Sequence, residues 1–148
     1  MLLLYNYKPA GFWIRFLANL VDGLIIFVLT FIVATIFNDQ AYFNGYNMNT
    51  YDNNAPSESI VNITYAIIFV VFFTASKYKG SPGKLACRIQ VLNEDKTQIS
   101  LLKSIGRYLS YFISALLLFI GFMMAGWNEE KKALHDMICN TRVVYRDK

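Results

Sequence analysis

The sequence predicts a membrane α-helical fold with two transmembrane helices and a third apolar helical segment, on three observations. Hydrophobic residues make up 55% of the 148 residues and aromatic residues 16%, more than in an ordinary soluble domain. The apolar residues gather in three long stretches. Basic residues flank these stretches, which is typical of membrane topology and not of nucleic-acid binding. We therefore expect one membrane domain over residues 1–148 that contacts membrane lipid and no nucleic acid.

The first stretch, Phe12–Phe37, predicts a tilted transmembrane helix. At a rise of ~1.5 Å per residue it is roughly 39 Å long, which exceeds the ~30 Å hydrocarbon core. Residues 1–7 contain no Lys or Arg, and the apolar run is longer than that of a signal peptide. We therefore expect this helix to remain in the mature protein and not to be cleaved off as a signal peptide.

Two charged residues lie within the first helix. Arg15 is near one end and can extend toward the interface, whereas Asp22 lies about two turns further in, where an ionised carboxylate is costly without a partner. The two side chains share a face but are roughly 10 Å apart along the axis, beyond the usual pairing distance. Each charge is therefore expected to find a partner on another segment, or the two enclose a shared polar site.

The next segments set the topology. Asn38–Ser59 is polar and contains no Lys or Arg, so the positive-inside rule predicts an outer loop. Ile60–Ser76 is a second apolar run, near the lower length limit for a transmembrane helix. Residues 77–104 are the predicted cytoplasmic segment, since Lys77–Arg107 carries seven basic and two acidic residues.

The basic segment holds the candidates for contact with anionic lipid headgroups. These are Lys77, Lys79, Lys84 and Arg88. Plain topological anchoring explains the same residues equally well. Lys84 follows Gly80-Ser81-Pro82-Gly83, which is predicted to be a turn.

Two short segments show the alternation of a half-buried strand. In Cys87–Leu92 the apolar residues alternate with Arg88 and Gln90, and Thr141–Arg146 alternates in a similar way. We predict that these two strands pair in a small cytoplasmic element.

The third apolar stretch, Ile105–Trp127, allows two paths. As one helix it would cross the membrane and leave the C-terminus outside. As a bent or re-entrant hairpin it would return the C-terminus to the cytoplasm, where the predicted strand pair and a weak excess of positive charge favour it. The residues after it, Asn128–Cys139, predict a short interfacial helix that starts at an Asn N-cap, and a strand follows within residues 128–148.

Several charged and turn residues together form a familiar ordered set. They are Arg15, Asp22, Ser81-Pro82-Gly83-Lys84, Arg107, His135-Asp136 and Thr141-Arg142-Val143-Val144. This set resembles the RDD family of small bacterial membrane proteins, which is named for an arginine and two aspartates. The match puts the arginine at Arg15 and the aspartates at Asp22 and Asp136. The resemblance implies a multi-pass protein of the bacterial inner membrane; some members are described as sodium/proton antiporters, and others accompany larger membrane systems.

These residues give two hypotheses about function. In the first, the protein is a monovalent cation/proton antiporter that works as a homo-oligomer. Asp22 then binds Na⁺ and H⁺ in turn, while His135 and Asp136 relay protons. In the second, the protein is an accessory subunit or assembly factor of a larger membrane transport complex, and the same charges form a structural network.

The spacing also suggests how the charges pair. We expect Arg15 to meet Asp136, and Arg107 to approach Asp22 if the third segment packs on the first helix. Cys87 and Cys139 are isolated thiols and supply no metal-ligand set. We expect no enzymatic activity, no cofactor and no metal centre.

Overall fold

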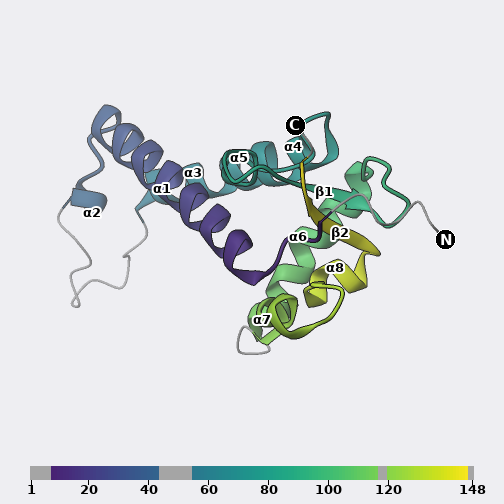
Figure 1. Ribbon diagram of the computed structural model, residues 1–148. Coiled ribbons are helices and arrows are strands. Elements are labelled where there is room, and N and C mark those ends of the chain that lie inside the picture. Colours follow the sequence, from purple (N-terminus) through teal and green to yellow (C-terminus); the bar gives the residue numbers. More distant parts are fainter. Residues whose placement is uncertain (1–7, 44–54, 117–119, 147–148) are drawn as a thin grey trace.

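The computed structural model describes residues 8–43, 55–116 and 120–146. Part of the predicted outer loop and the middle of the third apolar stretch lie outside the described residues. The elements are α1 (Phe12–Ile36), α2 (Gln40–Phe43), α3 (Pro56–Tyr65), the π-helical segment η2 (Ala66–Phe72), α4 (Phe73–Ala75), α5 (Pro82–Ala86), β1 (Ile89–Asn93), α6 (Leu101–Leu116), α7 (Ile120–Trp127), α8 (Leu134–Ile138) and β2 (Thr141–Tyr145). Long helices extend to one side, and the strands and α6 to α8 gather at the other (Figure 1).

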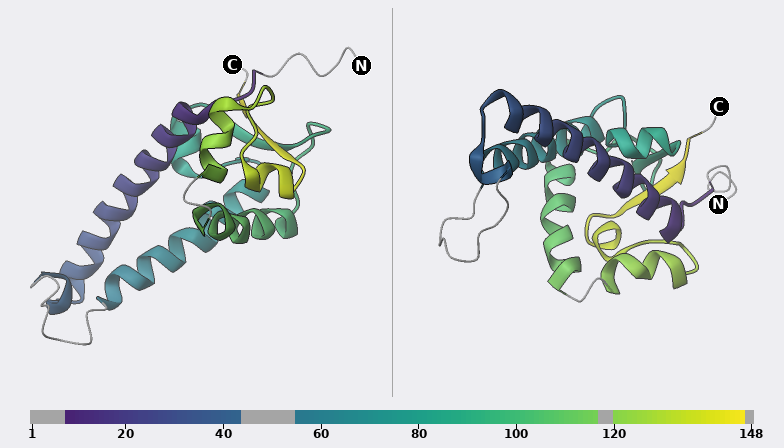
Figure 2. Two further views of the ribbon diagram at one scale, coloured as in Figure 1. Left: turned by 90° about the horizontal axis from the view of Figure 1, so that it is seen from below. Right: turned by 90° about the vertical axis from the view of Figure 1, so that its left-hand side faces the viewer.

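Within the part of the chain that the structure describes, two helices are long and apolar enough to cross a membrane, as predicted. The first is α1, which has 25 residues and ends one residue before the predicted boundary. The second runs without a break through α3, η2 and α4, from Pro56 to Ala75. It begins four residues earlier than expected because Pro56 occupies the first helical turn, where a missing N–H costs nothing. The two helices converge toward α2 (Figure 2).

A buried aspartate ties the convergent ends of these helices together. The Asp39 carboxylate accepts hydrogen bonds from the backbone N–H of Ser57 at 3.1 Å and from its hydroxyl at 2.5 Å. It also accepts the N–H groups of Ala41 at 3.1 Å and Tyr42 at 3.3 Å. Four donors replace the water that a carboxylate needs, so Asp39 links the end of α1 to the start of α3.

The predicted strand pair is confirmed. β1 and β2 are antiparallel, with Val91 opposite Val143. The residues before α1 extend this sheet on the free edge of β2, where the N–H of Ala10 donates to the carbonyl oxygen of Val143 at 2.9 Å. The core of the protein lies on this sheet, where Ala10, Ala18, Ile89, Val91, Ile99 and Val143 are buried together.

The strand pair decides the path of the third apolar stretch. The stretch forms two helices, α6 and α7, whose axes meet at 91°. β1 precedes this helix pair in the chain and β2 follows it, yet the two strands are hydrogen-bonded to each other. Both ends of the helix pair therefore lead to the same small sheet, which favours the re-entrant alternative. The start of α7 lies close to α6 at Gly121, since a Cβ there would stand 3.0 Å from the Cβ of Ser114.

Two local predictions are wrong. The predicted turn before Lys84 is partly helical, because Pro82 at the first helical position starts α5 directly after Ser81. The predicted helix from Asn128 begins only at Leu134. Asn128 instead closes a turn, since its side chain accepts the N–H of Glu130 at 3.0 Å, and Lys131 has the positive φ of 51°, which ends any helix there.

Candidate functional site

The buried charges form two separate sites, and Asp136 is the centre of the first. Asp136 lies in the first turn of α8, where its carboxylate accepts the N–H of Ala133 at 3.2 Å. Its Oδ2 forms an ion pair with Arg15, and its Oδ1 lies 2.7 Å from Nη1 of Arg107. Its side chain is fully buried. The predicted Arg15–Asp136 pair is thus confirmed, and a second arginine completes it.

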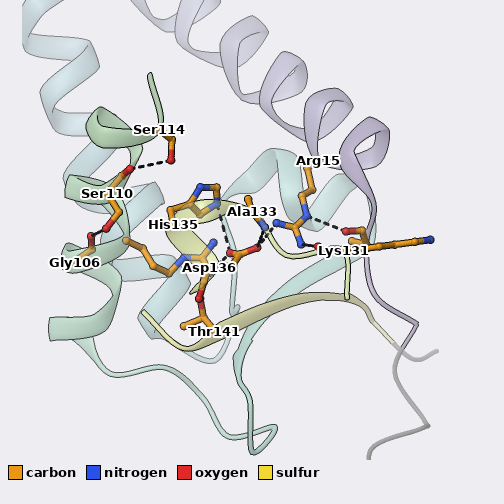
Figure 3. A network of polar contacts seen from close by, with 11 residues as sticks. Arg15, Gly106, Ser110, Ser114, Lys131, Ala133, His135, Asp136 and Thr141 are labelled. Atoms are coloured by element: carbon orange, nitrogen blue, oxygen red, sulfur yellow. Dashed lines mark hydrogen bonds and ion pairs between the residues drawn. The ribbon is translucent and has the colours of Figure 1, made fainter. Parts of the chain in front are cut away.

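Each arginine carries its own second set of contacts. Arg15 donates to the carbonyl oxygens of Ala10 at 2.9 Å and Lys131 at 2.7 Å. Arg107 donates to the hydroxyl of Thr141. Figure 3 shows Asp136 between Arg15 and His135, with Thr141 nearby. This network, which we call the Asp136 lock, joins α1, α6, α8, β2 and the segment before α1.

The surroundings of Asp136 and His135 in the Asp136 lock determine the ionisation state of each side chain at neutral pH. Burial would raise the pKa of Asp136, but the guanidinium groups of Arg107 and Arg15 outweigh it and keep this pKa well below its usual range. Burial lowers the pKa of His135 to about 3, and the nearby Asp136 does not compensate. At neutral pH Asp136 is ionised and His135 is neutral.

These shifts predict that acid destabilises the protein. Unfolded histidine takes up a proton near pH 6.5, whereas folded His135 does so only near pH 3. The unfolded state therefore binds more protons in this range. As the pH is lowered below ~6, the free energy of unfolding decreases by up to about 1.4 kcal/mol for each pH unit. Asp136 adds a loss below pH ~4, because the unfolded carboxyl is protonated first.

The measurement is chemical unfolding in detergent between pH 4.5 and 7. His135→Phe keeps a ring against Tyr111, whose ring centroid lies 4.4 Å from that of His135, but it removes the titrating nitrogen. We expect a flatter pH dependence in this variant than in the wild type. Parallel curves for the two proteins would contradict the assignment.

The second site surrounds Asp22. Its Oδ1 accepts hydrogen bonds from the Tyr65 hydroxyl at 2.6 Å and the Gly83 N–H at 2.7 Å, and its Oδ2 accepts the Ser81 hydroxyl at 2.6 Å. The donors come from α3, from α5 and from the residue before α5. We call this group the Asp22 site. Its three hydrogen bonds satisfy the buried carboxylate of Asp22, which forms no direct ion pair among the described residues.

Lys84 lies beside the Asp22 site. The side chain is buried, and Nζ is 3.4 Å from the Ser81 hydroxyl oxygen that also donates to Asp22. Lys84 and Asp22 both line a cavity of about 330 Å³ between α1, α3, η2 and α6. Its other polar lining residues are Asn19, Asn62, Tyr65, Tyr108 and Tyr111.

The structure corrects one expectation about the charged residues. Arg107 does not approach Asp22, because it is engaged with Asp136 and Thr141. Lys84, one of the four predicted headgroup contacts, is only 8% exposed. The other predicted headgroup contacts are placed differently: Lys77 and Arg88 are exposed and Lys79 is half-buried.

Sequence reasoning missed three hydrogen-bond partners of the buried charged residues. Ser81 precedes Pro82, which is a helix-start signal that would have put the Ser81 hydroxyl at the start of α5. Tyr65 stands inside an apolar run, where its hydroxyl needs a partner. Thr141, which accepts a hydrogen bond from Arg107, belongs to the ordered set described above, but its residue type gives no sign of this partner. Among the described residues, no group of three His, Cys, Asp or Glu side chains could hold a metal ion.

Comparison with known proteins supports the predicted resemblance. The RDD family matches residues 9–140. The chain is 37% identical to the uncharacterized protein YxaI of Bacillus subtilis (strain 168), over 94% of this chain and 99% of YxaI. It is 31% identical to the uncharacterized protein YckC of the same organism, over 94% of this chain and 86% of YckC. A third relative, 24% identical over 96% of this chain and 84% of its own length, is the uncharacterized membrane protein YteJ. No solved structure matches the chain.

Proposed function

Because this chain belongs to the RDD family of membrane proteins, we propose that it is a multi-pass protein of the bacterial inner membrane that exchanges a monovalent cation for protons at Asp22. The basic end that holds the strands would face the cytoplasm, as the positive-inside rule predicts. The main observation behind this proposal is that the Asp22 carboxylate lies within a transmembrane helix and is buried on the wall of a cavity of about 330 Å³. An ionisable group at such a position is a functional-site candidate by default.

The partners of Asp22 suit an exchange between two cations. Carboxylate and hydroxyl oxygens are the hard ligands that sodium prefers. The hydroxyls of Tyr65 and Ser81 can turn a lone pair toward an incoming ion, whereas the N–H of Gly83 keeps holding the carboxylate in place. Lys84, linked through Ser81, supplies an internal positive charge to the empty, ionised site.

The Asp136 lock takes a structural part in this proposal. Its carboxylate is held ionised by two arginines and its histidine is neutral, so neither group is poised to carry protons at neutral pH. The lock instead fixes α1 against α6 and α8. We further propose that the protein works as a homo-oligomer, because two transmembrane helices and one bent pair offer few elements for alternating access.

The test is sodium-driven proton flux in proteoliposomes. We expect Asp22→Asn to abolish flux, since the amide cannot exchange a proton for a cation. Asp39→Asn is the matched control, because Asp39 is also a buried aspartate with serine partners but lies beyond the end of α1. It should retain flux. Flux that persists in Asp22→Asn would contradict the proposed site.

One observation favours the second candidate function, an accessory subunit or assembly factor of a larger membrane transport complex. Three hydrogen bonds already satisfy Asp22, as they would in a purely structural site. Folded wild-type protein without flux would favour this role. Affinity purification from native membranes would then identify the partner.

A further inference from the structure

A second cavity, of about 470 Å³, lies on the other side of Lys84. Its wall combines basic and apolar side chains. The basic residues are Arg15, Lys84 and Arg107, and the aromatic ones include Phe12, Phe16 and Phe122. His135 also lines this cavity. Such a mixture is the lining expected for a ligand with a charged head and an apolar tail.

The charges around this cavity do not balance. Three cations, Arg15, Lys84 and Arg107, face one carboxylate, Asp136, within the lock. Asp22, which reaches Lys84 through Ser81, supplies a second negative charge. One positive charge therefore remains uncompensated in a buried region, where an unpaired charge is costly. A ligand with a single negative charge would complete the balance.

The hydrogen bonds define the ligand further. Among the described residues, the Lys84 ammonium has one hydrogen-bond partner, the Ser81 hydroxyl at 3.4 Å, so a strong donor is left for an anionic oxygen. Nδ1 of His135 is also buried with no hydrogen-bond partner among the described residues. A hydroxyl group can meet this nitrogen in either tautomer of the imidazole, because a hydroxyl both donates and accepts. The site therefore suits a ligand with both an anionic group and a hydroxyl group.

We propose that this cavity binds the headgroup of an acidic phospholipid, a phosphodiester that carries a free hydroxyl group. The phosphodiester supplies one negative charge to Lys84, and the headgroup hydroxyl forms a hydrogen bond with Nδ1 of His135. The acyl chains leave along α1 past Phe16, which is half exposed on the outer face of the helix. The proposal does not require cation exchange at Asp22, although the two sites share Lys84.

Calorimetric titration of the detergent-solubilised full chain tests the site. Short-chain phosphatidylglycerol is expected to bind with one-to-one stoichiometry. Phosphatidylmethanol, which has the same charge but no headgroup hydroxyl, should bind at least about fivefold more weakly, and phosphatidylcholine should not saturate. Equal binding of phosphatidylcholine would overturn the proposal. Equally tight binding of glycerol phosphate would show that a free phosphate, and not a lipid, is the ligand.

Variants separate this site from general attraction to a basic protein. Lys84→Met should weaken the binding of phosphatidylglycerol at least tenfold, whereas Lys77→Met, at an exposed lysine of the same segment, should leave it unchanged. His135→Phe should remove the preference for phosphatidylglycerol over phosphatidylmethanol, and this ratio remains informative if Lys84→Met does not fold. An unchanged affinity in Lys84→Met, or an unchanged preference in His135→Phe, would overturn the assignment.

Discussion

Asp136→Asn is expected to lower the free energy of unfolding by about 3–5 kcal/mol, the usual cost of removing one partner from a buried ion pair. Asparagine has nearly the same volume and keeps an oxygen for the N–H of Ala133, so the change mainly removes charge. Arg15 and Arg107 would then face each other in a buried region without a carboxylate between them. Denaturant unfolding in detergent measures the loss.

Two further variants show whether charge is the cause. Glu129→Gln removes an exposed acid from the loop before α8 and should change stability by less than about 0.5 kcal/mol. Arg15→Gln combined with Asp136→Asn should recover part of the loss, because only one uncompensated guanidinium remains. A stability of Asp136→Asn equal to the wild type would show that the lock does not hold the fold together.

Gly83→Ala is expected to destabilise the protein by about 3 kcal/mol or more, at the upper end of the range for overpacking. A Cβ at Gly83 would stand 2.1 Å from the carbonyl oxygen of Ala18 and 2.7 Å from Cγ of Asp22. Most of this contact is with the backbone of α1, which cannot turn aside like a flexible side chain. Separation of α5 from α1 would also break the bond from the Gly83 N–H to Asp22.

Gly23→Ala is the matched control, since it adds the same methyl group at the position that follows Asp22 on α1. A Cβ at Gly23 meets nothing within 4 Å among the described residues, and alanine is the better helix former. Its stability should equal or exceed that of the wild type in thermal unfolding. Similar behaviour of the two variants would contradict the close approach of α5 to α1.

Local patterns in the sequence predicted most of the elements. The long apolar run of α1 and the alternation in β1 and β2 are each visible within a single segment, so their types and approximate bounds followed directly. The boundaries near Pro56 and Asn128 shifted because single residues, a proline in a first turn and Lys131 with positive φ, decide where a helix starts or ends.

The candidate site could be predicted only in part. Arg15 and Asp22 are identifiable from sequence because a charge in an apolar helix requires a partner. Their partners were predictable only in part: Arg15 pairs with Asp136, 121 positions away, as expected, whereas Asp22 meets hydroxyls and a backbone N–H instead of Arg107.

By itself, the sequence determined that this is a membrane protein with buried charges at one end of its first helix, because hydropathy and charge are properties of local composition. Only the tertiary structure decided how the charges divide. The return of α7 and the pairing of β1 with β2 bring α8 back to α1, and this places Asp136 between two arginines. The close packing of α5 on α1 leaves Asp22 to Tyr65, Ser81 and Gly83. Such contacts depend on the relative positions of distant segments, and no local pattern encodes them.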